Sequence, residues 1–214
     1  LEASDFTFSL AGGTASLSST TPTSISTADN LTFVLGVGLS GTVNGGELLV
    51  VNPVDDSIYD VAGNEASTTQ SNNSVYLNDN TVPTITTVSS TNANGTYGIG
   101  KVVSITVTFS EVVNVTGTPQ LTLETGTTDA VVNYGSGSGT NILTFNYTVS
   151  AGDTTSDLDY SSTTSLALAS GTIKDEASNA AKLTLVSPGA VYSLGANKAI
   201  IIDGNAPTVS SVSS

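Results

Sequence analysis

Carboxylate and amide side chains recur at matched positions in the two halves of this 214-residue sequence. The pattern Ile-x-Asp-x-Ala-Gly/Ser-Asn occupies residues 58–64 and again residues 173–179, and a further Asp follows each copy. The repeated oxygen-bearing residues are Asp60, Asn64 and Asp79 in the first half and Asp175, Asn179 and Asp203 in the second. Calcium takes about six to eight oxygen ligands from such groups. One interpretation of the pattern is therefore a calcium site in each half.

Turn geometry gives a second interpretation of the same residues. Asp and Asn side chains hydrogen-bond to the backbone nearby and tolerate a left-handed conformation, so they are frequent in tight turns. The Asp–Asn pattern alone fits a turn and a calcium site equally well, and both interpretations stay open.

The composition excludes several kinds of catalysis. The sequence contains no His and no Cys. It therefore cannot form a Ser-His-Asp triad, a Cys nucleophile or a His- or Cys-ligated zinc site. Paired carboxylates could in principle serve a hydrolase, and the candidates are Asp55, Asp56, Asp153, Asp157 and Asp159. Because only 6% of residues are aromatic and could line a sugar cleft, solvated turns explain these acids better, and we expect no enzyme.

The charge balance limits the partners. The formal net charge is −14, with 18 acidic against four basic residues. Such a surface repels nucleic acid and anionic membranes, so neither is expected as a partner. No run of about 18 apolar residues is present, and we expect no membrane insertion.

Short runs rich in Val, Ile, Thr, Phe and Tyr are separated by Gly/Asn/Asp/Ser clusters throughout the chain. In residues 104–110, Ile105, Val107 and Phe109 alternate with Ser and Thr, which is typical of a half-buried antiparallel strand. The sequence predicts an all-β protein made of antiparallel sandwiches. The predicted strands cover residues 5–10, 31–39, 47–52, 84–90, 102–110, 120–125, 130–134, 142–150 and 198–203.

A repeated Asp-to-Pro segment sets the predicted domain boundaries. Residues 79–83 read DNTVP and residues 203–207 read DGNAP. We predict an incomplete domain at 1–80, a complete domain at 81–205, and the opening strand of a following domain at 206–214. The first domain has about thirty residues fewer before its Asp–Asn pattern, roughly the length of two strands with their turn. We therefore expect it to lack its opening strands.

These segments resemble tandem bacterial immunoglobulin-like (cadherin-like) repeats of giant surface adhesins and extracellular fibre proteins. The resemblance rests on residues 83–126 and 171–209 and covers almost the whole chain. It implies two tandem immunoglobulin-like sandwiches that stack end to end. It also implies structural Ca²⁺ between modules, since DGNAP resembles the calcium-binding linker of cadherins and the family often has a Glu at Glu111. With Glu111, the expected ligands are Asp60, Asn64, Asp79, Asp175, Asn179 and Asp203.

The function implied by the resemblance is a structural module of an extracellular bacterial fibre or adhesin stalk, secreted or on the cell surface. A glycan- or protein-binding adhesive module is the alternative. The expected partners are copies of the chain or neighbouring repeats. Residues 206–214 either belong to the next repeat of a longer tandem protein or add a strand to the incomplete domain of another copy.

Overall fold

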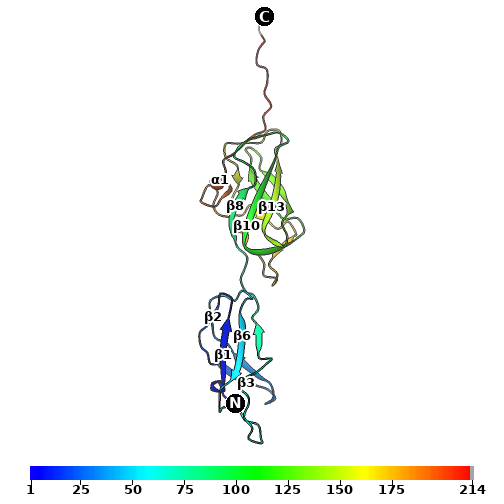
Figure 1. Ribbon diagram of the computed structural model, residues 1–214. Coiled ribbons are helices and arrows are strands. Elements are labelled where there is room, and N and C mark those ends of the chain that lie inside the picture. Colours follow the sequence, from blue (N-terminus) through cyan, green and yellow to red (C-terminus); the bar gives the residue numbers. More distant parts are fainter. Residues whose placement is uncertain (213–214) are drawn as a thin grey trace. The chain divides into compact units, whose positions relative to one another are not determined.

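The protein is described by a computed structural model that covers residues 1–212 (Figure 1). The last two residues of the predicted segment 206–214 lie outside this description. The chain divides into two compact units, unit 1 (Leu1–Thr81) and unit 2 (Val82–Ser214). Within residues 1–212, no helix is both long and apolar enough to cross a membrane.

Unit 1 is built from short antiparallel strands around a small core. Its elements are the 3-10 helix η1 (Ala3–Asp5) and strands β1 (Phe6–Ala11), β2 (Ser16–Leu17), β3 (Ser24–Thr27), β4 (Phe33–Gly36), β5 (Leu39–Ser40), β6 (Leu48–Pro53) and β7 (Ser74–Tyr76). The largest sheet has the order β1-β6-β7, while β2–β5 and β3–β4 form separate pairs. Few apolar side chains are buried in this unit: Phe8, Ala15, Val43 and Leu49.

Unit 2 is larger and has a continuous core. Its strands are β8 (Ile85–Ser90), β9 (Gly95–Gly98), β10 (Val102–Thr116), β11 (Gln120–Glu124), β12 (Ala130–Ser136), β13 (Thr140–Thr148), β14 (Thr154–Thr155), β15 (Asp159–Tyr160), β16 (Leu166–Ala167), β17 (Thr172–Lys174) and β18 (Ile200–Asp203). One short helix, α1 (Leu194–Asn197), precedes β18. The largest sheet has the order β15-β11-β12-β13-β10-β17, with β8 also paired to β10.

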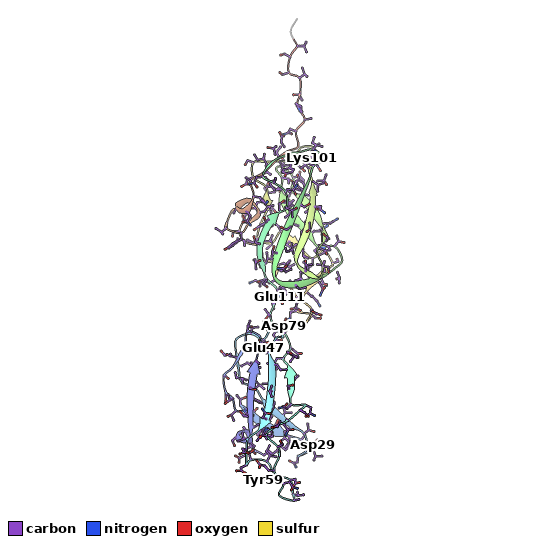
Figure 2. All side chains as sticks on the ribbon, in the orientation of Figure 1. Asp29, Glu47, Tyr59, Asp79, Lys101 and Glu111 are labelled. Atoms are coloured by element: carbon purple, nitrogen blue, oxygen red, sulfur yellow. The ribbon has the colours of Figure 1, made fainter. Side chains whose placement is uncertain are left out.

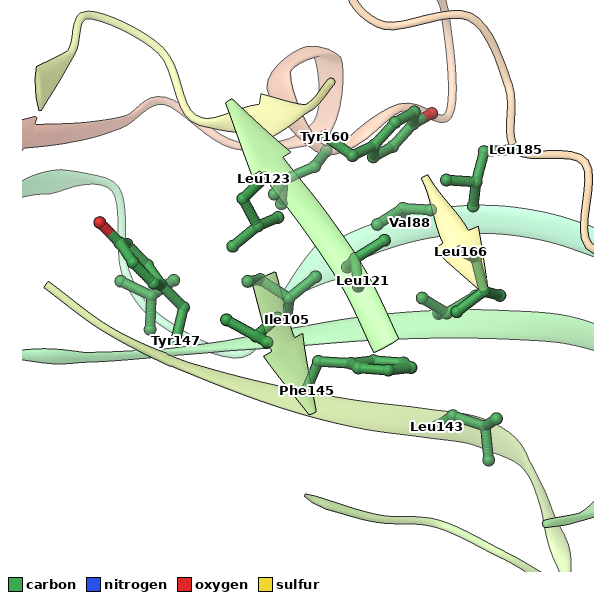
Figure 3. Packing of buried hydrophobic residues seen from close by; sticks show 14 of the residues in the cluster. Val88, Ile105, Leu121, Leu123, Leu143, Phe145, Tyr147, Tyr160, Leu166 and Leu185 are labelled. Atoms are coloured by element: carbon green, nitrogen blue, oxygen red, sulfur yellow. The ribbon is translucent and has the colours of Figure 1, made fainter. Parts of the chain in front are cut away.

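The alternation in β10 explains how the core of unit 2 forms. Ile105 and Val107 are 0% exposed and Phe109 is 1% exposed, while the Ser and Thr residues between them lie on the more accessible face. The side chains of one strand point alternately to opposite faces of the sheet, so these three residues share one face. Figure 3 shows leucines of β11 facing Ile105 and Phe145 across this core.

The predicted fold class is confirmed. Apart from the two short helices, the regular structure of residues 1–212 consists of strands, and their sheets are almost entirely antiparallel. The exception is β9, which pairs in parallel with β18 along Gly95–Gly98. This segment lies between the predicted strands 84–90 and 102–110, where glycines and asparagines indicate a turn rather than a strand. The backbone of β18 offers Gly95–Gly98 a pairing partner that no local pattern reveals.

Candidate metal site

The repeated Asp–Asn pattern folds into the same loop in both units. In unit 1, one carboxylate oxygen of Asp60 accepts hydrogen bonds from the backbone N–H groups of Ala62 and Asn64, both at 2.8 Å. The other oxygen accepts from the Asn64 side-chain amide, also at 2.8 Å. The loop is closed by the Asp60 N–H, which donates to the Asn64 carbonyl at 2.9 Å. These bonds, led by that of the Asn64 amide, hold the pKa of Asp60 below its usual value.

In unit 2 the loop is built from Asp175 and Asn179. Asp175 accepts from the Asn179 N–H at 2.7 Å and from the Asn179 side-chain amide at 2.9 Å. The Asp175 N–H again donates to the Asn179 carbonyl, at 3.1 Å. Asp175 is only 5% exposed, whereas Asp60 lies at the surface. Turn chemistry therefore accounts for the Asp–Asn pair in each unit, and a metal site would need further oxygen ligands from residues around the loop.

A second carboxylate faces this loop in unit 2. Glu111 and Asp175 each place a carboxylate oxygen within 4.8 Å of the other's. Glu111 is part of β10 and is half-buried, while Asp175 directly follows β17. The two elements are paired from Asn114↔Lys174 to Thr116↔Thr172, which brings the carboxylates together. Two oxygens that bind one Ca²⁺ at about 2.3–2.6 Å lie no more than about 5 Å apart. The pair therefore fits a calcium ion in both spacing and donor type.

The pair lies at the end of unit 2 where the chain enters it. The Pro83 carbonyl accepts a hydrogen bond from the Lys182 N–H at 2.8 Å, and the Thr84 carbonyl accepts one from the Ser110 N–H at 2.8 Å. Ser110 is the neighbour of Glu111. The two carboxylates are consequently close to the first residues of unit 2.

Asp203 lies at the opposite end of the same unit. It pairs with Gly98 in the parallel ladder, and the Gly98 carbonyl accepts a hydrogen bond from the Lys101 N–H at 3.1 Å. Figure 2 shows Lys101 and Glu111 at opposite ends of unit 2. The structure thus brings Glu111 together with Asp175 and Asn179 but leaves Asp203 apart from them.

The predicted ligands of unit 1 are likewise separated. Asp60 follows Tyr59, and Figure 2 shows Tyr59 and Asp79 at opposite ends of the unit. Asp79 lies against Gly45 and accepts a hydrogen bond from the Thr81 N–H at 2.8 Å. Asp60 and Asn64 therefore cannot share one cation with Asp79 inside unit 1.

Among the carboxylates considered for hydrolysis, Asp153 and Asp159 have structural partners. Asp153 accepts from the Tyr147 hydroxyl at 2.6 Å and from the Ser150 N–H at 2.9 Å. Asp159 is buried and accepts from the N–H groups of Tyr160 and Gly189, both at 2.9 Å. Desolvation, and then the charge of Asp159, raise the pKa of Asp157. Asp55 and Asp56 are exposed residues of a turn.

Glu47 is an ionisable residue whose importance sequence analysis missed. It is completely buried in unit 1. Its carboxylate accepts from the N–H groups of Ala15 at 2.8 Å, Thr14 at 2.7 Å and Asn44 at 3.0 Å. The Ala15 bond, supported by the others, holds the pKa of Glu47 below its usual value. The signal in the sequence was a single Glu between a Gly-Gly turn and the apolar run that follows it.

Comparisons with family models, with curated proteins and with solved structures found no match.

Proposed function

We propose that this chain is a structural repeat module of an extracellular bacterial fibre or adhesin stalk, that its units are immunoglobulin-like, and that it stacks end to end with neighbouring repeats. Calcium stiffens the module in this proposal. The observation that carries it is the Glu111–Asp175 pair, whose carboxylate oxygens lie within 4.8 Å of each other. Asp175 belongs to the loop that unit 1 repeats, and Glu111 faces that loop from β10.

The chemistry of the pair favours a cation. Two carboxylates at this spacing repel each other, and unit 2 belongs to a chain whose net charge is already −14. Calcium would remove this repulsion and would join β10 to the loop after β17. Glu111 and Asp175 would bind the ion directly, and the Asn179 amide would hold the Asp175 side chain in place.

Other ligands would have to come from neighbouring residues. Asp79 stands three residues before Val82 in the sequence, so its expected contribution to this site stays a prediction. Asp203 precedes residues 206–214 in the same way. In a tandem array each module would thus supply one Asp to the chain that follows it, as the repeated DNTVP and DGNAP segments suggest.

Force spectroscopy on the full chain, held by its two ends, tests the mechanical role. A stalk module should resist force, and calcium should raise the force at which unit 2 unfolds because the ion joins two separate elements. The same pulling experiment with a chelator gives the reference value. Among the described residues, no group of three or more carboxylates close enough to hold a metal ion lies wholly within unit 1, which therefore serves as the internal control.

The adhesive alternative makes a different prediction. In this alternative the chain binds a glycan or a protein, so the ligand would stabilise the chain against unfolding. A glycan array would show reproducible binding. Binding on the array, combined with an unfolding force that does not respond to calcium, would replace the stalk proposal by the adhesive one.

A further inference from the structure

Strand β4 of unit 1 matches strand β13 of unit 2. Residues 31–33 and 143–145 both read Leu-Thr-Phe. In unit 2 these residues lie inside β13, whereas in unit 1 Phe33 begins β4 and Leu31 lies in the bend just before it. Each is the second strand of an antiparallel hairpin, β3–β4 in unit 1 and β12–β13 in unit 2. Each unit also has an antiparallel pairing between a strand before this hairpin and one after it, β1 with β6 and β11 with β15. In unit 2 that pairing belongs to the same sheet as the hairpin, whereas in unit 1 β3–β4 is a separate pair.

Burial differs sharply between the matched residues. In unit 2, Leu143 and Phe145 are 0% exposed. In unit 1, the matching Leu31 is 87% exposed and Phe33 is only half-buried. Unit 1 therefore leaves uncovered a set of apolar side chains that unit 2 covers completely.

Unit 1 lacks a strand pairing that unit 2 has at the matching position. In unit 2, β13 is paired on one edge with β12 and on the other with β10, and β10 is paired in turn with β8. Within residues 1–212, β4 pairs only with β3. Its other edge presents backbone groups beside exposed apolar residues, which is the arrangement that accepts an added strand.

The same chain carries a segment suited to such an edge. Residues 206–212, APTVSSV, and residues 82–88, VPTITTV, are identical at three of seven positions, and at three others they exchange Val for Ile or Ser for Thr. The earlier copy forms most of β8, pairs with β10 and buries Val88 completely. In the later copy, Val209 is 84% exposed and Val212 is 91% exposed, and the segment takes part in no strand.

We infer that the free edge of β4 accepts residues 206–212 from a second copy of this chain. The added strand would hydrogen-bond to the β4 backbone at the edge that β10 occupies on β13 in unit 2, and it would lay its valines over Leu31 and Phe33. The donor and acceptor surfaces differ, so the contact is head-to-tail and builds linear chains rather than closed rings. This inference rests on the proposed function, because it names the partner and the contact through which such modules would join.

Sedimentation velocity of the full chain over a concentration series tests the contact at about 0.15 M salt, where long-range repulsion is screened. We expect the mass to rise with concentration above the monomer value of 21.4 kDa. Chains with Val209→Asp and Val212→Asp should remain monomers, because a strand carrying these charges cannot cover an apolar surface. Leu31→Asp, on the acceptor side, should have the same effect.

Matched variants keep the test specific. Val191→Asp with Tyr192→Asp adds, at exposed positions of unit 2, the same two charges as the Val209/Val212 changes. Val61→Asp adds, at an exposed position of unit 1, the same single charge as Leu31→Asp. Both should associate as the unchanged chain does. An excess of a peptide with the sequence of residues 206–214 should dissolve the assemblies by occupying β4.

Two results would overturn the inference. One is a full chain that stays monomeric at every concentration, and the other is association that persists unchanged in the Val209/Val212 and Leu31 variants. Neither result bears on calcium binding by Glu111 and Asp175, so the stalk proposal would be judged separately by its own experiments.

Discussion

Gly63 and Ser178 occupy the same position in two copies of one loop, and both have a positive φ, 87° for Gly63 and 76° for Ser178. Each lies one residue before the Asn that closes the loop on its Asp. Glycine adopts this conformation without steric penalty, whereas a residue with a Cβ atom is strained there. The loop of unit 2 therefore forms with backbone strain at Ser178, whereas Gly63 lets the loop of unit 1 form without it.

Exchanging the residue types at this position should shift stability in opposite directions. Ser178→Gly should stabilise unit 2 by up to about 1 kcal/mol, and Gly63→Ala should destabilise unit 1 by about as much. A Cβ at Gly63 would meet no atom within 4 Å, so the loss would come from the backbone alone. Urea unfolding of the full chain measures both changes.

A neighbouring substitution provides the control for this pair. Ala177 is next to Ser178 in the sequence, and its own φ is not positive. Ala177→Gly should therefore destabilise unit 2 slightly, because glycine gives the unfolded chain more conformational freedom. Stabilisation by Ala177→Gly equal to that by Ser178→Gly would show that strain at Ser178 is not the cause.

The matched phenylalanines of the two units should differ in their energetic weight. Phe145→Ala should cost about 3–5 kcal/mol, because the side chain is fully buried and the core of unit 2 cannot close around the gap. Phe33→Ala should cost much less, since its side chain is already half exposed in the single chain. Denaturant unfolding at low protein concentration measures the loss of unfolding free energy in each variant. Equal losses would contradict the conclusion that Phe33 is left uncovered in unit 1.

Glu47 should make unit 1 sensitive to acid. Its pKa in the folded state is held below the ordinary value of 4.5, so its stabilising effect is complete above pH 4.5. The effect is lost as pH falls through the lower folded-state pKa, because the unfolded chain then binds more protons. Thermal unfolding between about pH 7 and pH 3 should show this loss.

Glu47→Gln should flatten the acid dependence of unit 1 and lower its stability at neutral pH, because the amide is uncharged and has one acceptor fewer. Some acid dependence should remain, since the pKa of Asp60 is also lowered. Asp55→Asn, at an exposed turn, is the matched control and should leave the profile unchanged. An unchanged slope in Glu47→Gln would contradict the assignment.

The strands with the clearest alternation could be predicted from sequence. Residues 102–110 were expected as one strand, and β10 begins at Val102 as predicted but continues to Thr116. Its second half pairs with β17, a contact between distant segments that the local pattern does not contain. The helix α1 also escaped prediction, because four residues are too few to show a helical period.

The candidate site could be predicted only in part. Repetition pointed to Asp175 and Asn179, and the family resemblance pointed to Glu111, which the structure places beside Asp175. Sequence alone did not show that Asp203 is at the other end of the unit, because the parallel pairing of β18 with β9 decides its place. Nor did it show the burial of Glu47, which depends on backbone donors more than thirty positions away.

Differential scanning calorimetry of the full chain tests calcium binding by unit 2, because it measures the Tm of this unit with and without the ion. Extracellular modules bind calcium with dissociation constants of about 10⁻⁴–10⁻³ M. At about 10 mM calcium the unfolding free energy of unit 2 should therefore rise by about 1.4–2.7 kcal/mol relative to a chelator. This corresponds to an increase of several degrees in its Tm.

Two substitutions make the calorimetric result decisive. Glu111→Gln should abolish the calcium-dependent rise in Tm while it leaves the Asp175–Asn179 loop intact. Glu176→Gln, which removes the same charge from an exposed neighbour of Asp175, should keep the rise. The Tm of unit 2 should be higher in calcium than in chelator for the unchanged chain and for Glu176→Gln, and equal in the two solutions for Glu111→Gln. Equal Tm values for the unchanged chain in calcium and in chelator would contradict it.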